Sequence, residues 1–88
     1  MAEQLRFALL RLTAARALTG DARSTWYEKK KSGLLTEPIS IGPRAKAYPQ
    51  HEIEAINRAR IAGATEDEIR QLVQRLHKQR KTFAPEVE

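Results

Sequence analysis

Hydrophobic residues recur along the chain with two different periods, and the period indicates which kind of element forms. The clearest helical spacing, i, i+3, i+4 and i+7, belongs to a stripe of four residues: Ile69, Leu72, Val73 and Leu76. Thr65 and Glu68 precede this stripe at the spacing of a capping box, in which each side chain bonds the backbone of the other. The sequence therefore predicts an amphipathic helix within 64–81.

Three shorter helices are predicted over 13–18, 22–32 and 49–62. Thr13 is the expected N-cap of the first helix, and Pro49 opens the third. Each helix is followed by a residue that suits a left-handed helix end: Gly20, Gly33 and Gly63. The connection between the first two helices is short, which favours a helix-turn-helix.

Between the second and third helices the period changes to two. Ile39 and Ile41 alternate with Ser40, and a Gly-Pro-Arg turn follows at 42–44. This pattern predicts two short strands that form a small hairpin, or wing.

The predicted fold class is mainly α with a small β-hairpin: a winged helix-turn-helix plus an appended C-terminal helix. We assign residues 1–63 to the winged helix-turn-helix domain. Residues 64–81 are predicted to form the amphipathic helix, packed on this domain or on a partner, and 82–88 a tail. Leu9 and Leu10 are expected only to lead into the first helix.

Charge is divided unevenly along the chain. Residues 1–48 carry nine Lys or Arg against four Asp or Glu, whereas residues 49–88 carry seven of each. The entire net charge of +5 therefore resides in the part predicted to form the helix-turn-helix and the hairpin. Such a basic face is typical of a protein that binds nucleic acid.

Eight residues are candidates for DNA binding: Arg23, Ser24, Thr25, Tyr27, Lys30, Lys31, Arg44 and Lys46. If Trp26 points inward as a core residue, the start of the second helix presents Arg23 and its neighbours to base edges or a phosphate. Lys30 and Lys31 would contact phosphates, and Arg44 with Lys46 would reach the backbone or the minor groove. A structural interpretation remains open for several of them, because short runs of lysine are often only a solvated helix face.

No catalytic, metal or cofactor site is predicted. The chain has no cysteine, and His51 and His77 are far apart and expected at the surface. The acidic run at 66–68 is explained by helix capping, and neither a nucleophile–base pair nor a glycine-rich phosphate loop is found. We therefore expect a protein that is not an enzyme and has no small-molecule substrate. Because arginines interrupt the apolar N-terminal run, we also expect a cytoplasmic protein with no membrane partner.

Motifs over residues 6–62 resemble the AlpA family of small phage and prophage regulators, within the wider MerR-like and excisionase-like winged-helix group. The resemblance rests on these residues: Leu12, Leu18-Thr19-Gly20, Arg23-Ser24-Thr25, Tyr27, Gly33, Ile41-Gly42-Pro43-Arg44, Tyr48 and 52–56. It implies a second helix in the major groove, a wing on the minor groove, and a role in transcription or excision of mobile elements.

The chain departs from this family at two places. Asp21 and Ala22 stand where an apolar residue and a serine are common, so Asp21 becomes the candidate helix cap. Lys29 and Lys30 occupy positions that are commonly apolar, which reduces the core beneath the second helix.

The function predicted from the sequence is sequence-specific binding of double-stranded DNA, by a transcriptional regulator or an excisionase-type directionality factor. The alternative is a protein–protein interaction module that uses the Ile69–Leu76 stripe. Whether a homodimer or a cooperative oligomer forms on DNA stays open, as does the DNA sequence that is bound.

Overall fold

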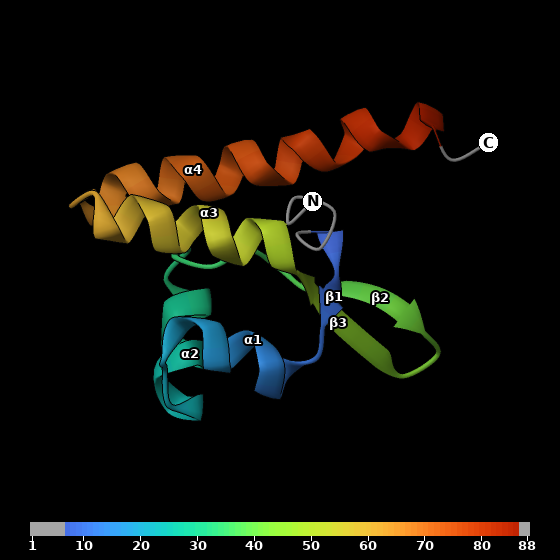
Figure 1. The fold of residues 1–88 in the computed structure, drawn as a ribbon, viewed down its shortest axis with the longest axis horizontal. Helices are drawn as coiled ribbons and strands as arrows, with labels where there is room; N and C mark the ends of the chain where they lie inside the picture. Colours follow the sequence, from blue (N-terminus) through green and yellow to red (C-terminus); the bar gives the residue numbers. More distant parts are fainter. Residues whose placement is uncertain (1–6, 87–88) are drawn as a thin grey trace.

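The computed structural model describes residues 7–86, and within this range the chain is mostly helical. Its four α-helices and small antiparallel sheet (Figure 1) confirm the predicted fold class at this level of description. The elements are, in order, β1 Leu9–Leu10, α1 Leu12–Thr19, α2 Arg23–Lys31, β2 Ile39–Gly42, β3 Ala45–Pro49, α3 Gln50–Ile61, α4 Glu66–Gln79 and a 3-10 helix, η2, Arg80–Glu86.

Local signals placed most helix ends correctly. The three glycines predicted to end helices all have positive φ, which costs glycine little because it has no Cβ. The capping box of α4 is present, with Glu68 N–H donating to Thr65 Oγ1 at 3.2 Å and Thr65 N–H to Glu68 Oε1 at 2.8 Å. Thr13, however, is not the N-cap of α1: the helix already includes Leu12, which packs against the core, and Arg11 is the N-cap.

The sheet has three strands in the described part of the chain, in the order β1-β3-β2. The predicted hairpin is β2 and β3, joined at Pro43 and Arg44, with a bulge at Ile41 between the Ser40–Lys46 and Gly42–Ala45 pairs. Strand β1, which was not predicted, pairs with the opposite edge of β3. Two residues are too few to show a period, so only the folded chain reveals this strand.

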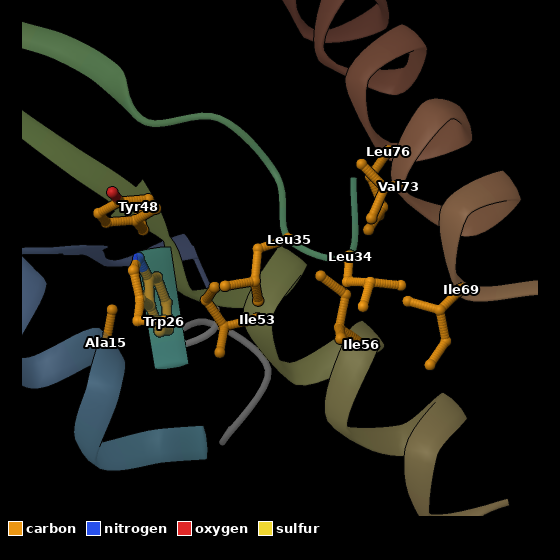
Figure 2. Close-up of a cluster of buried hydrophobic side chains, with 10 residues drawn as sticks. All are labelled: Ala15, Trp26, Leu34, Leu35, Tyr48, Ile53, Ile56, Ile69, Val73 and Leu76. Atoms are coloured by element: carbon orange, nitrogen blue, oxygen red, sulfur yellow. The ribbon is translucent and has the colours of Figure 1, made fainter. Parts of the chain in front are cut away.

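One continuous core joins α1, α2, α3 and α4 (Figure 2). Trp26, fully buried as predicted, lies against Ala15 and meets the ring of Tyr48 edge-on at 5.1 Å between centroids. From there the cluster continues through these residues: Leu35, Ile53, Leu34, Ile56, Ile69, Val73 and Leu76.

Helix α4 runs antiparallel to α3 and forms the outer layer on the side away from α1 and α2 (Figure 1). Three residues of its apolar stripe, Ile69, Val73 and Leu76, are buried in the core, and Leu72 packs at its edge. The stripe is therefore covered by the chain itself. Beyond α4, residues 80–86 form η2, where a tail was expected from 82; residues 87–88 of that tail lie outside the described residues.

Candidate nucleic-acid interface

Helix α2 buries one residue and exposes most of the others. Only Trp26 is fully inside, whereas five candidate residues of this helix are exposed: Arg23, Ser24, Thr25, Tyr27 and Lys31. The remaining candidate on this helix, Lys30, is half-buried. Because one large aromatic anchors the helix to the core, its whole outer face is available for contacts with a partner.

The turn between α1 and α2 is held by an ion pair that the sequence did not predict. Lys29 Nζ lies 2.8 Å from Asp21 Oδ1, and both side chains are largely shielded from solvent. Arg16 Nε also donates to the carbonyl oxygen of Asp21 at 3.2 Å. The expectation that Asp21 caps α2 is wrong. Ala22 is the N-cap, and the carboxylate of Asp21 accepts a hydrogen bond from Lys29 instead. Lys29 thus has a structural role.

Tyr27 lies between two cations on the outer face of α2. Its ring centroid is 6.0 Å from Arg23 Cζ and 5.8 Å from Lys30 Nζ, at the limit of cation–π contact. The three residues recur at helical spacing, so they form one row along the helix. Lys30 Nζ also lies 3.9 Å from Glu37 Oε1, a weak pair because the carboxylate is mostly exposed.

The hairpin supplies the two other candidate cations. Arg44 lies at the turn, and Lys46 lies in β3 opposite Ser40; both are exposed. Among the described residues, neither has an ion-pair partner. Their charges are consequently not neutralised within this part of the chain.

A basic pocket of about 370 Å³ lies where α1, α2 and the hairpin meet. Its lining consists of Arg11, Leu12, Thr13, Tyr27, Lys30, Pro38, Lys46 and Tyr48. Three of the lining residues are cations that come from three separate segments of the chain. No carboxylate is among the lining residues that the structure describes.

The basic pocket unites only part of the predicted site. It brings together Tyr27, Lys30 and Lys46, whereas the other candidates of α2 and the hairpin tip lie outside it. Arg11, Thr13 and Tyr48 line it without having been predicted. Arg11 and Thr13 give no local signal, because a cation and a hydroxyl near a helix start are common; only the packing of α1 beside the hairpin brings them here.

On the other side of the sheet, a buried carboxylate binds the C-terminal helix. Glu52 in α3 is fully buried and accepts two hydrogen bonds of 2.7 Å from Arg80, which also donates to the carbonyl oxygen of Glu37 at 2.6 Å. The hydrogen bonds to Glu52 raise the pKa of Arg80, against the opposing effect of burial. This arrangement attaches η2 to α3 and to the segment that leads into the hairpin.

The two histidines expected at the surface instead make defined contacts. His51 packs in an aromatic cluster, with its ring centroid 5.0 Å from that of Phe7 and 5.9 Å from that of Phe83. His77 Nε2 accepts a hydrogen bond of 3.0 Å from the backbone N–H of Glu37. Both residues therefore hold the C-terminal helices on the rest of the fold.

Comparison with known proteins leaves the function to be inferred from the site: no family model, curated protein or solved structure matches the chain significantly. In the described range no helix has the length and hydrophobicity to cross a membrane. Nor does any group of three or more histidine and carboxylate side chains in that range offer a metal site.

Proposed function

We propose that the protein binds double-stranded DNA as a winged helix-turn-helix, with α2 as the recognition helix and the β2–β3 hairpin as the wing. The observation that carries this proposal is the basic pocket, to which α2 contributes Tyr27 and Lys30 and the hairpin contributes Lys46. A helix and a hairpin that share one basic pocket can engage the same duplex at once.

The outer face of α2 has the chemistry of base recognition. Arg23, Ser24 and Thr25 are exposed in its first turn, the part of a recognition helix that usually contacts base edges. An arginine there reads guanine through its O6 and N7 acceptors, and hydroxyls accept or donate to either base pair. Among the described residues Arg23 has no ion-pair partner, so its guanidinium is available for such a contact.

The hairpin has the size and charge of a wing. Its two-residue turn carries Arg44, and a cation of this kind enters the narrow minor groove or contacts the adjacent phosphates. The resemblance to AlpA-like regulators extends the proposal to control of transcription, or of site-specific recombination in mobile elements.

The alternative of a protein-interaction module gains no support from the packing of α4. Its stripe would have to leave the core before a partner could contact it, since Ile69, Val73 and Leu76 are at most 5% exposed. Removing these side chains from the core would also uncover Leu34 and Ile56.

The direct test is selection of bound duplexes from a random double-stranded DNA library at physiological salt, followed by sequencing. Enrichment of one motif by the full chain supports the proposal, and repeated half-sites would give the spacing of a dimer or filament. The matched control is Arg75→Gln, which removes an exposed arginine from α4 and should leave the motif unchanged. Failure of the folded wild-type chain to retain any duplex, even at low salt, would overturn the proposal.

A further inference from the structure

We infer that the basic pocket binds one backbone phosphate of the DNA duplex, with Arg11 and Thr13 of the α1 segment as additional contacts. This inference rests on the proposed DNA binding and adds two residues, Arg11 and Thr13, that lie outside the recognition helix and the wing. The partner group is a phosphodiester, which carries one negative charge and two oxygens that accept hydrogen bonds.

The first argument is the charge of the pocket. Arg11, Lys30 and Lys46 line it, from the segment before α1, from α2 and from β3. No carboxylate is among the described lining residues, and Glu37, which pairs with Lys30 at 3.9 Å, is mostly exposed and lies outside the lining. A phosphate that entered the pocket would therefore meet three cationic residues and no acidic one.

The second argument is the character of the remaining lining. Thr13 and Tyr27 add side-chain hydroxyls, which commonly bond DNA phosphates. Leu12 and Pro38 add apolar surface, suited to the deoxyribose next to a phosphate. A pocket with both kinds of wall fits a sugar–phosphate backbone better than a simple inorganic ion.

The third argument is position. If α2 lies in the major groove and the hairpin lies on the adjacent minor groove, the strand that separates the two grooves must pass between these elements. The basic pocket lies between them. One of its lining residues, Tyr48, is only 5% exposed and packs edge-on against the buried Trp26, which joins the pocket to the core.

The test combines protein variants with DNA in which single phosphates are replaced by neutral methylphosphonates, using a duplex selected as above. For the wild type, one replacement per bound protein should weaken binding by about tenfold. For Arg11→Gln, that same replacement should cost less than in the wild type, because part of the contact is already lost. The salt dependence of log K should also fall by about 0.9 in this variant. Arg75→Gln is the matched control and should respond like the wild type.

The outcomes separate this inference from the proposed function. Additive losses at every phosphate for Arg11→Gln, with an unchanged salt dependence, would overturn the phosphate pocket while DNA binding stands. Absence of duplex binding by the wild type would overturn both. Inorganic phosphate at constant ionic strength is the second probe. If this ion binds in a way that depends on Arg11, while Arg11→Gln and the methylphosphonate replacements weaken DNA binding additively, the pocket binds a free anion. That result would overturn its assignment to DNA. Lys46→Gln should reproduce the result of Arg11→Gln, and thermal unfolding checks that both variants fold.

Discussion

Arg80 binds both carboxylate oxygens of Glu52, Nε to Oε2 and Nη2 to Oε1, each at 2.7 Å, across 28 positions of the chain. Since Glu52 is fully buried, its charge has no access to water, and within residues 7–86 Arg80 is the cation that pairs with it. The pair connects η2 to the start of α3, which directly follows hairpin strand β3.

Arg80→Met should destabilise the protein strongly, by about 3–5 kcal/mol, because it leaves a buried charge without a partner. The double variant Glu52→Leu with Arg80→Met should cost less than Arg80→Met alone, since no charge is then buried. Urea unfolding of both variants measures the difference. Equal losses in the two would show that packing of Arg80, and not its charge, matters.

The stabilisation by Arg80 should not depend on pH near neutrality. Its pKa is raised in the folded state, so its contribution is fully present below the unfolded pKa and is lost only as pH rises through the folded value. We expect the difference in unfolding free energy between the wild type and the double variant Glu52→Leu with Arg80→Met, in which neither charge is present, to stay constant from about pH 6 to pH 9. A marked change across that range would point to another titrating group.

Two lysines of α2, Lys29 and Lys31, should have opposite effects on stability and on DNA binding. Lys29→Met removes the pair with Asp21 and should lower the unfolding free energy by about 1 kcal/mol, with little change in the salt dependence of DNA binding. Lys31→Met should leave stability unchanged, weaken binding to all duplexes alike, and reduce the salt dependence by about 0.9. Denaturation and anisotropy titrations of the two variants, each the control of the other, decide the point. The reverse pattern would place Lys29 at the DNA.

Arg23→Ala should relax the sequence preference at one position of the selected motif, by about 1–3 kcal/mol. A bidentate contact from arginine forms only with guanine, so its removal weakens binding to the preferred sequence and not to sequences with another base at that position. Repeating the library selection with this variant measures the effect. A loss of affinity that is equal on every sequence would instead make Arg23 a phosphate contact.

The salt dependence of the wild type should reflect the number of phosphates neutralised. With about four to six such contacts, log K should fall against log salt concentration with a slope of about −4 to −5. Anisotropy titrations between low and physiological salt give this slope. A slope near zero would contradict an interface built on the basic face.

Ile69→Ala should cost about 2–5 kcal/mol, since it removes a residue that is 1% exposed from the core beneath α4. For the same reason a chain that ends at Gly63 should fail to fold. Gln71→Ala, on the exposed side of α4, is the control and should change stability little. Thermal unfolding of a stable, cooperative 1–63 fragment would contradict a single shared core.

Signals confined to a few neighbouring residues predicted much of this fold. Gly20 ends α1, Thr65 and Glu68 form their capping box, and the hairpin turns where Pro43 and Arg44 stand. In each case the energy that decides the conformation comes from groups within one helical turn or one hairpin, so the linear order of residues contains the information.

The local pattern gave a wrong prediction where a residue of another turn or helix bonded the side chain in question. Asp21 is suitable as a cap, but Lys29 lies within reach and takes its carboxylate. The Ile69–Leu76 stripe indicated that α4 buries one face, yet an apolar stripe has the same form whether it packs on its own chain or on another. Its packing on α3 and on the segment after α2 decides this in favour of the chain itself.

By itself the sequence determined which four segments form α-helices, where most of these helices end, which half is basic and that Trp26 is the buried residue of α2. The tertiary structure alone decided the pairing of β1 with β3, the burial of Glu52 against Arg80, and the meeting of Arg11, Lys30 and Lys46 in one pocket. The first group depends on interactions between residues close in sequence. The second depends on contacts between residues far apart, whose proximity follows only from how the elements pack.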